Sequence, residues 1–529
     1  MIALTPFILL VFAAILILVL NQIKINLGRL WLIAMVFSLL NWGLVLILYW
    51  FMPFTFTINN WFSVSNIFQT GFSFTLNQYS WIYLFSLSAV FLAVIMSEST
   101  RITEDYQAQN WVASFLIAAI GVLISVSDSI LTIILVWTVI DLVEFGVILG
   151  TVKTQKQSLE TVLSFVVRLG GTVLLIFAAL YSNYINGYFD FGSVPFNIGF
   201  VLLISVGLRL GVLPFNLPYM KEIPLRRGLG IIIRMTSVVS SIVVINRFVL
   251  ISNAESNYHL IQIFVTLAIA AGSILWVVSK NELEGRPFWI IVLSGFVIES
   301  LINGYPTAAI AWSLVLLLTG SVLFLFSDRS KWLFILPAIS ILSMIGLPFT
   351  PNAIGLSGLI GDNLIFTLTN LSACFVLIFG YLRFALKPAK NLESNERWVW
   401  LVYPLGLVLL IVTHFIVFFI TDLNWIILGP LWISIPILVL SIVVVFFNQR
   451  VKTENQYSAW ARVFSERLSA SVSTFLRFDW LYKILWGIFQ FFQSILNNLS
   501  GILEGHGGII WVLVLVALLI TLVSPKGIQ

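Results

Sequence analysis

Apolar segments long enough to cross a lipid bilayer recur along the chain, and only short polar stretches separate most of them. A membrane-spanning helix needs about 20 mostly apolar residues, because lipid offers no partner to backbone N–H and C=O groups. The pattern therefore predicts an all-α polytopic membrane protein with about sixteen transmembrane helices. The predicted spans are residues 2–20, 29–51, 80–97, 111–127, 129–150, 159–181, 196–219, 229–251, 259–279, 287–302, 305–326, 332–350, 364–386, 398–420, 424–447 and 508–524.

Positive charge alternates from one connecting loop to the next. Counted from the first span, every odd loop contains Lys or Arg, whereas no even loop as far as Asp422 contains either. A missed or invented span would destroy this alternation, because all later loops would change sides. Cytoplasmic loops are enriched in Lys and Arg, so the odd loops are predicted to be cytoplasmic and the N-terminus outside. We expect a multi-pass protein of a bacterial inner or plasma membrane.

Composition supports a membrane protein and excludes several other classes. Of 529 residues, 60% are hydrophobic and 9% are charged, whereas about a quarter of a soluble domain is charged. The N-terminal segment lacks a basic region and a cleavage site, so it is predicted to be a retained span. The one cysteine, Cys374, excludes an internal disulfide. His259, His414 and His506 are scattered and no glycine-rich nucleotide loop occurs, so no metal, cofactor or nucleic-acid partner is predicted.

Charged side chains inside the predicted spans are the candidate functional residues. A charge at the bilayer centre costs about 2.5–3.5 kcal/mol on the insertion scale, so each needs a partner or a function. The ion-relay candidates are Asp141, Glu144, Arg168, Arg209, Arg234 and Glu299. Three further charges, Asp128, Arg247 and Arg383, lie near span ends or in a short turn and are expected to be structural.

Five of these candidates fall on four successive spans. Asp141 and Glu144 are three residues apart, so they share one helix face, and Arg168, Arg209 and Arg234 follow on the next three spans. Such a chain of charges is either a proton or ion relay or a static ion-pair network that fixes helix packing. Glu299, on the tenth span, is either the acid of a second relay or a packing partner. The residues alone leave both choices open.

Proline interrupts two of the spans. Pro214 and Pro218 follow Arg209, and Pro348 lies near the end of the twelfth span. Proline removes a backbone donor and frees carbonyl groups, which is tolerated at membrane depth where the backbone is buried in protein or lines a wet cavity. The two breaks are about five spans apart, which indicates an internal repeat of five helices.

The chain is predicted to have five regions. These are N-terminal helices at 1–110, a first repeat at 111–255, a second, degenerate repeat with the following helices at 256–450, an amphipathic segment at 451–505 and a last transmembrane helix at 506–529. The segment 451–505 mixes charges with Trp, Phe, Leu and Ile, as a helix lying along the cytoplasmic face would. A pair of ordinary surface helices packed on the spans is the alternative.

Four short motifs resemble a known family, the antiporter-like, proton-conducting membrane subunits of respiratory complex I and of Mrp-type sodium/proton antiporters. They are Trp137-Thr-Val-Ile-Asp-Leu, Val167-Arg-Leu-Gly170, Leu208-Arg-Leu-Gly-Val-Leu-Pro214 and Met344-Ile-Gly-Leu-Pro348. Their order and spacing carry the resemblance, which runs over roughly residues 80–450. It implies two inverted five-helix repeats, each with a broken helix, and a central line of Lys, Glu and His residues that carries protons. The late amphipathic segment resembles the lateral helix of the larger members.

The chain departs from this family at the centre of the relay. Thr138 stands where the family has its glutamate, Arg209 where it has its lysine, Arg234 near its eighth-helix histidine and Asn216 at the histidine between the two prolines, and positions such as Ser321 in the eleventh and twelfth spans carry no lysine. Arginine stays charged in proteins, unlike a desolvated lysine, and threonine does not titrate. Either Asp141 and Glu144 have taken over the relay, or the chain no longer pumps.

The predicted function is therefore that of an antiporter-like integral membrane subunit of a multi-subunit complex. It would translocate protons or Na⁺ through the buried charges, with pumping altered or lost. Its partners would be the lipid bilayer and other membrane subunits of a complex I-like or Mrp-like assembly. At most it would be a non-catalytic, proton-translocating subunit of an NADH:quinone oxidoreductase-like complex. A non-pumping membrane anchor for a soluble partner and a stand-alone cation or solute transporter are the alternatives.

Overall fold

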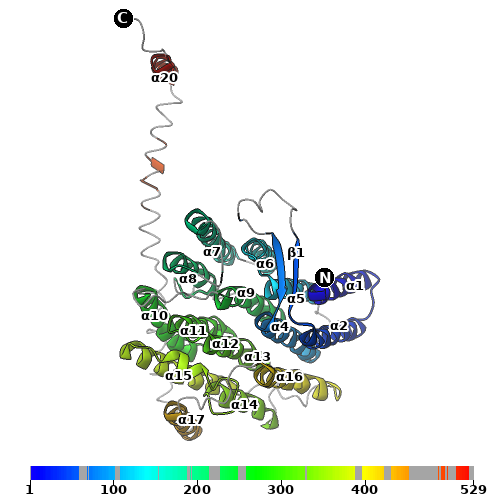
Figure 1. The fold of residues 1–529 in the computed structure, drawn as a ribbon. Coiled ribbons are helices and arrows are strands. Elements are labelled where there is room, and N and C mark those ends of the chain that lie inside the picture. Colours follow the sequence, from blue (N-terminus) through cyan, green and yellow to red (C-terminus); the bar gives the residue numbers. More distant parts are fainter. Residues whose placement is uncertain are drawn as a thin grey trace, which may run out of the picture. The chain divides into compact units, whose positions relative to one another are not determined.

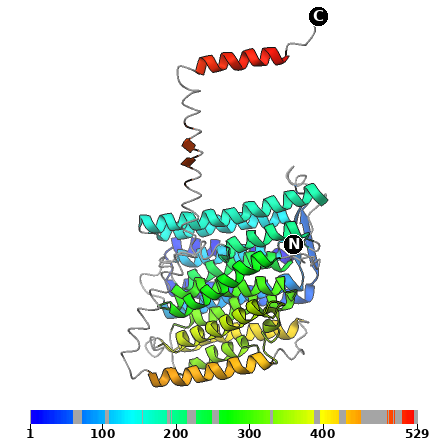
Figure 2. The same ribbon diagram turned by 90° about the vertical axis from the view of Figure 1, so that its left-hand side faces the viewer.

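The computed structural model contains two units, Met1–Ser469 and Ala470–Gln529. It describes residues 2–58, 68, 71–101, 108–152, 154–186, 191, 194–213, 227–247, 258–327, 331–387, 396–421, 431–451 and 508–523, with a few positions between 487 and 497. In the first unit the helices lie side by side with roughly parallel axes (Figures 1 and 2). The prediction of an all-α polytopic membrane protein is confirmed.

Twelve helices of the described chain are long and apolar enough to cross a membrane. Shorter apolar helices occur at Asn197–Leu210, Trp332–Met344 and Leu431–Val443. The helices of the first unit are α1 (Thr5–Gln22), α2 (Leu27–Leu48), α4 (Gln78–Ser97), α5 (Gln109–Val126), α6 (Ile130–Thr151), α7 (Gln155–Asn186), α8 (Phe196–Leu210), α9 (Arg227–Arg247), α10 (His259–Val278), α11 (Glu282–Ile302), α12 (Pro306–Leu314), α13 (Gly320–Leu325), α14 (Ile335–Met344), α15 (Leu364–Ala385), α16 (Val399–Ile420) and α17 (Leu431–Val451). The second unit contains α20 (Gly508–Val523).

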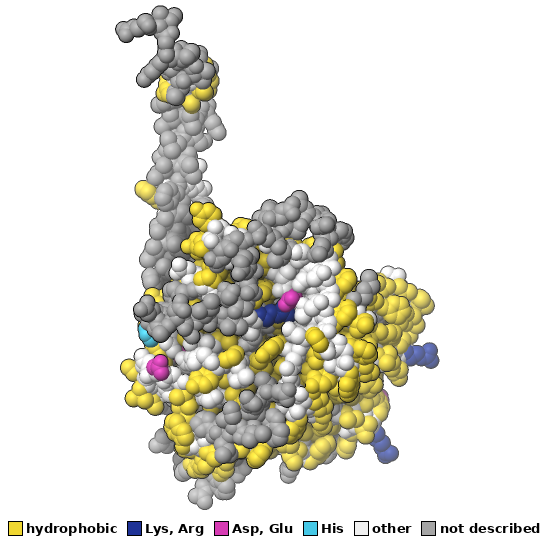
Figure 3. Space-filling model, viewed as in Figure 1, with side chains coloured by type: hydrophobic (Ala, Val, Ile, Leu, Met, Phe, Trp, Pro, Cys, Tyr) yellow, Lys and Arg dark blue, Asp and Glu magenta, His cyan; other side chains and the backbone are white. Residues whose placement is uncertain are grey.

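Three helical segments form the centre of the first unit. The apolar windows of α4, α9 and the span Pro306–Leu325 are buried along their whole length, whereas only a third of the windows that contain α1 and α2 is buried. Helix α4 packs against α2, α5, α9 and α16, and α9 packs against α5, α6, α8 and α11. Hydrophobic side chains predominate on the face of this unit shown in Figure 3, as expected for helices that meet lipid on their outer sides.

Tryptophan side chains connect neighbouring helices through their polar edge. An indole N–H is a donor only, so a buried tryptophan needs an acceptor. Six buried indoles donate to backbone carbonyls elsewhere in the fold, in the pairs Trp31–Ile95, Trp81–Val45, Trp137–Ser240, Trp276–Leu377, Trp289–Leu316 and Trp312–Gly355. In lipid, the hydrophobic effect does not drive helices together, so these hydrogen bonds help to fix their relative positions.

Helices α12 and α13 belong to one helical span, and a π-helical turn at Val315–Thr319 joins them. A π turn leaves carbonyl groups displaced from the ordinary ladder, and such turns often occur at functional sites. Here the carbonyl of Leu316 accepts from Trp289 at 3.2 Å and that of Thr319 accepts from the Tyr381 hydroxyl at 3.1 Å. Aromatic side chains from α11 and α15 therefore hold the wide turn in place.

The predicted span 332–350 is too long at its C-terminal end. Helix α14 stops at Met344, because Gly346 and Phe349 both have positive φ angles, and Pro348 lies in the turn that follows. The side chain of Asn352 is fully buried and donates to the Met344 carbonyl at 3.1 Å. This irregular backbone is thus buried and bonded inside the protein, the setting in which it is tolerated at membrane depth.

The helix break predicted after Arg209 is described only at its beginning. Helix α8 ends at Leu210, and Gly211 takes the left-handed conformation with φ 72° that commonly ends helices. Pro214 and Pro218 lie outside the described residues, as does almost all of the predicted amphipathic segment 451–505. The division into five regions and the inverted repeats stay predictions.

One element was not predicted from the sequence. Strands β1 (Phe54–Ile58) and β2 (Phe72–Leu76) form an antiparallel pair between α2 and α4, with Phe54 opposite Leu76. Both strands alternate Phe, Ile or Leu with Thr or Ser, a pattern typical of a strand. The side chains of Ser73 and Thr75 on β2 donate to Asp128, at the turn that precedes α6.

Candidate functional site

Helix α6 carries both acids of the site on its buried face. Its buried positions include Val136, Trp137, Ile140, Asp141, Glu144 and Ile148, whereas Leu135, Val139, Leu142 and Leu149 are exposed. This spacing follows the helical period. Asp141 and Glu144 therefore face the interior of the bundle, as the sequence predicted.

Asp141 forms a two-pronged ion pair with Arg209 of α8. Nη1 of Arg209 lies 2.5 Å from Oδ2 of Asp141, and Nη2 lies 2.9 Å from Oδ1. The guanidinium also lies over the ring of Trp137, 4.2 Å from its centroid, a favourable cation–π geometry. Both charged side chains are at most 2% exposed, so the pair is fully removed from solvent.

Hydroxyl groups from two other helices complete the surroundings of Arg209. Nη1 donates to Thr172 of α7 at 3.1 Å, and Nε donates to Ser241 of α9 at 3.3 Å. A planar guanidinium presents its donors in a fixed fork, so these contacts set its orientation as well as its charge. Arg209 is thereby bonded to α6, α7 and α9 at once.

Glu144 lies between two arginines. Its Oε2 accepts from Nη1 of Arg168 on α7, and its Oε1 accepts from Nη1 of Arg234 on α9 at 3.0 Å. Nη1 of Arg168 also donates to Ser237 at 2.8 Å. The three charged side chains are between 3% and 5% exposed. One carboxylate therefore joins two helices through guanidinium groups.

The charges of this network do not cancel. Three guanidinium groups, those of Arg168, Arg209 and Arg234, meet the two carboxylates of Asp141 and Glu144, which leaves one positive charge in excess. We refer to these five residues as the charge network. A permanently charged guanidinium contacts each of the two acids.

Glu299 does not join the charge network. It lies on α11, where its Oε1 accepts from Nε2 of Gln262 at 2.8 Å. Of the six candidate relay residues, the structure thus brings together five and leaves one among neutral side chains. The charges expected to be structural have ordinary partners: Arg247 pairs with Asp128 at 2.9 Å, and Arg383 donates to the Ser279 carbonyl.

Charged contacts missed by the sequence analysis lie at one end of α9 and α11. Arg227 pairs with Glu282 at 2.8 Å, which shows that the two helices begin at the same end and run parallel. Arg286, one turn after Glu282, is 9% exposed and lies within electrostatic reach of Arg227 and Arg234. Charged side chains therefore occur on α9 and α11 between Arg234 and this end of the bundle, and the basic residues among them are arginines. The sequence placed Arg227 and Arg286 in loops, where they gave no sign of pairing.

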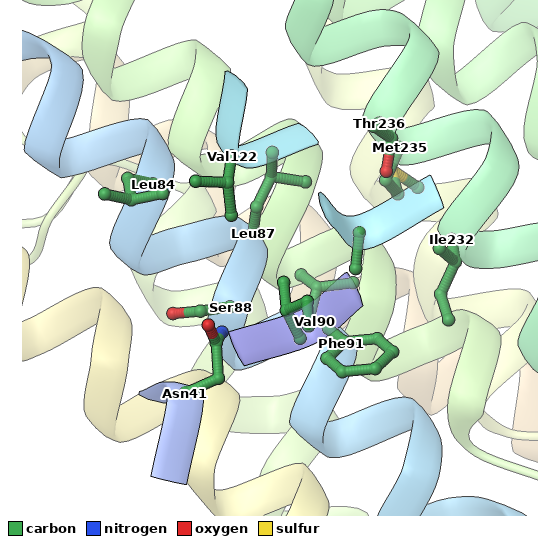
Figure 4. A pocket seen from close by; sticks show the side chains of 12 residues that line it. Asn41, Leu84, Leu87, Ser88, Val90, Phe91, Val122, Ile232, Met235 and Thr236 are labelled. Atoms are coloured by element: carbon green, nitrogen blue, oxygen red, sulfur yellow. The ribbon is translucent and has the colours of Figure 1, made fainter. Parts of the chain in front are cut away.

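Two cavities in the described part of the chain lie away from the charge network. One is formed by α1, α2, α4, α5 and α9, and its lining is mainly apolar, with Asn41, Ser88 and Thr236 as its polar side chains (Figure 4). The other lies beside the π turn, and its polar lining residues are Thr319, Ser340, Ser343 and His414. The charges of the network instead contact one another directly.

Comparison with known proteins shows a shared fold at low sequence identity. No protein-family model and no curated protein matches the sequence. A chain of the Mrp complex from Dietzia sp. superimposes with a TM-score of 0.66 at 15% identity, over 94% of this chain and 62% of that one. A chain of the archaeal membrane-bound sulfane sulfur reductase, a respiratory membrane complex, gives 0.67 at 14% identity over 98% and 99% of the two chains.

A chain of respiratory complex I from Thermus thermophilus gives a TM-score of 0.60 at 13% identity, over 78% of this chain and 97% of that one. The protein has the fold of these membrane-complex chains. It spans only 62% of the length of the Mrp chain. The resemblance to Mrp and complex I proteins that the motifs predicted is thus confirmed at the level of the fold.

The geometry explains one departure from the family motif. Thr138, which the resemblance aligns with the family's glutamate, uses its hydroxyl to bond the Ile134 carbonyl of its own helix at 2.8 Å. Asp141, about one turn later on α6, supplies the carboxylate that meets Arg209. The carboxylate that meets Arg209 therefore comes from Asp141, whereas Thr138 bonds within its own helix.

The Asp141–Arg209 pair predicts strong coupling between the two side chains. Either Asp141→Leu or Arg209→Met alone should lower the free energy of unfolding by about 3–5 kcal/mol, because it leaves one buried charge without its partner. The double variant should lose much less than the sum of the two single losses. Thermal and denaturant unfolding in detergent micelles would measure this cycle, and additive losses would contradict the pairing.

The close approach of α7 and α8 predicts a second effect. A Cβ atom on Gly171 would lie 2.7 Å from Cγ of Arg209 and 2.8 Å from the Ser205 carbonyl oxygen. Gly171→Ala should therefore push α8 away, disturb the Asp141–Arg209 pair and destabilise the protein by about 1–3 kcal/mol.

Gly170→Ala is the matched control, since a Cβ there meets no heavy atom within 4 Å. It should leave stability unchanged or raise it by up to about 1 kcal/mol through helix propensity. Equal unfolding temperatures for the two variants would contradict the predicted crowding at Gly171.

Proposed function

We propose that the protein is an antiporter-like membrane subunit of a multi-subunit complex that moves protons or Na⁺ across the membrane. The observation that carries the proposal is the charge network, in which acids and bases from α6, α7, α8 and α9 meet inside the bundle. Ionisable residues inside a membrane bundle commonly mark ion pathways. The shared fold with chains of the Mrp complex and respiratory complex I supports the same reading.

The network differs from a chain of exchangeable groups, because all of its cations are arginines. We infer that Arg168, Arg209 and Arg234 act as fixed charges, which set the electrostatic potential felt by a mobile ion without carrying the ion themselves. Asp141 and Glu144 would respond to that potential. Translocation in this part of the chain would therefore be altered relative to a lysine-based relay.

We further propose the orientation that the loop charges predict, with the N-terminus outside and the odd loops cytoplasmic. In this orientation Arg227 and Arg286 lie at the cytoplasmic ends of α9 and α11. The partners would be other membrane subunits, which the names of the complexes with the same fold support.

The permanently charged arginines also favour a second candidate, a non-pumping membrane anchor. Each of the three arginines is paired with an acid, so the network could act purely as a structural connection that holds α6 to α9 in one arrangement. The anchor would need its shape and its partners, but no ion flux.

Ion flux separates the two candidates. The complex purified through this chain, reconstituted in proteoliposomes, should show proton or Na⁺ flux that Glu144→Gln lowers by about tenfold or more, since 1.4 kcal/mol of lost electrostatic stabilisation changes a rate by that factor. A pH-sensitive dye and radioactive sodium would measure the two ions separately.

Asp128→Asn is the matched control, because Asp128 is also paired with an arginine but its side chain is 44% exposed. It should leave the flux within about twofold, as expected for an exposed pair worth less than 1 kcal/mol. An intact complex with no flux in the wild type would reject translocation and favour the anchor. Full flux by the isolated chain would instead indicate a self-contained transporter.

A further inference from the structure

Glu299 is buried among neutral amides. It lies one turn before the end of α11 and is 1% exposed. Gln262 of α10 donates to its Oε1, and the amide side chains of Asn303 and Asn370 also stand next to the carboxyl group. Gln262 contacts Asn303 at 3.3 Å, and Asn303 donates to the Gly358 carbonyl at 3.0 Å. Amide side chains from three segments of the chain, α10, the turn after α11 and α15, therefore surround one acid.

Several polar atoms at this place make no ordinary hydrogen bond. They are Oε2 of Glu299, the hydroxyl of Ser300 and both polar atoms of the Asn370 amide, in side chains that are at most 1% exposed. An amide oxygen needs a donor, and an ionised carboxylate has none to offer. A protonated carboxyl group has one. A proton on Glu299 would thus supply a donor for the Asn370 amide oxygen or the Ser300 hydroxyl, which the described side chains leave without a partner.

No basic side chain of the described residues neutralises Glu299. Elements packed against α11 carry these titratable groups at the same end: Tyr258 and His259 at the start of α10, Arg247 at the end of α9, Tyr305 before α12 and Asp362 before α15. Arg247 is paired with Asp128, and His259 and Asp362 are exposed. Arg286 lies thirteen residues earlier on α11, which is about 20 Å along the helix axis.

The carboxyl group is close to the surface. Asn303, four residues after Glu299, begins a turn in which Gly304, Tyr305 and Pro306 are exposed. Gly361 packs against the Asn303 side chain, and the exposed Asp362 follows it. One helical turn, about 5 Å, therefore separates the acid from a polar turn at the end of the bundle.

We propose that Glu299 is an exchangeable proton site, distinct from the charge network. The O–H group of the protonated acid would donate to the neighbouring Asn370 amide, whose oxygen otherwise lacks a donor. On release, the proton passes to water at the 303–306 turn, and the carboxylate that remains is held by amide N–H donors of Gln262 and its neighbours. A lone carboxylate buried without a counter-charge is costly, so the proton returns readily. Asp141 and Glu144, in contrast, are neutralised by arginines.

The site deepens the proposed function, since it assigns the exchangeable proton of the second half of the chain to one residue. Its test does not depend on transport. Dicyclohexylcarbodiimide forms adducts with protonated carboxyl groups in apolar surroundings, and peptide mass spectrometry locates the adduct. The full-length protein in lipid nanodiscs should be labelled at Glu299, less as the pH rises, while Asp141 and Glu144 stay unlabelled.

Two variants make the result specific. Glu299→Gln, an isostere of the protonated acid, should abolish the label and leave the unfolding temperature unchanged, whereas Glu144→Gln should lower the unfolding temperature. An unlabelled Glu299 in the folded protein, or equal labelling of Glu144, would overturn the proposal. So would protection of Glu299 by sodium chloride but not by choline chloride, because the exchanging ion would then be sodium.

Labelling of Glu299 in a complex that shows no flux would reject the proposed function and leave the proton site standing. Flux without labelling of Glu299 would reject the proton site and leave the proposed function standing. The two failures are therefore distinguishable.

Discussion

An arginine inside a bundle of membrane-crossing helices must find an anion and enough acceptors, since neither lipid nor an apolar helix face provides them. The pairing of Arg209 with Asp141 meets this requirement, and Arg209 also donates to the backbone carbonyl of Arg168, which pairs with Glu144. Because Arg209 also bonds Thr172 and Ser241, the position of α8 relative to α7 and α9 follows from one side chain. The close contact at Gly171 exists for the same reason, as the helices must approach before these bonds can form.

The chain uses two different ways to keep an acid inside the bundle. Glu144 is surrounded by charge, with Arg168 on one oxygen and Arg234 on the other. Glu299 is surrounded by amides, which offer dipoles and no net charge. The first arrangement resists protonation changes because its counter-charges are permanent. The second is sensitive to them, which is why the two acids are expected to differ in chemical reactivity although both are buried.

Much of the fold could be predicted from hydrophobic pattern alone, because the bilayer allows few structures. The helices, the shared face of Asp141 and Glu144, and the meeting of five charges all followed from periodicity and from the cost of burying charge. What the sequence could not supply was the contact partner of each group. Arg227 and its partner Glu282 are 55 positions apart, and Gln262 and Asn370 are 37 and 71 positions from Glu299. The strands β1 and β2 were missed because their alternation is short and lies between long apolar runs.

The π turn at Val315–Thr319 has a consequence for the geometry of the second half. Such a turn accommodates one residue more than an α-helix over the same rise, so the residues after it are rotated by about 100° relative to an unbroken helix. Gly320 follows the turn directly and packs closely against the indole of Trp289, since a Cβ there would lie 2.4 Å from Nε1. Deleting a single residue within the turn would restore a regular helix and swing α13 round its axis. The face of α13 that now meets α11 would then turn away from α11. The extra residue therefore determines which face of α13 packs against its neighbours.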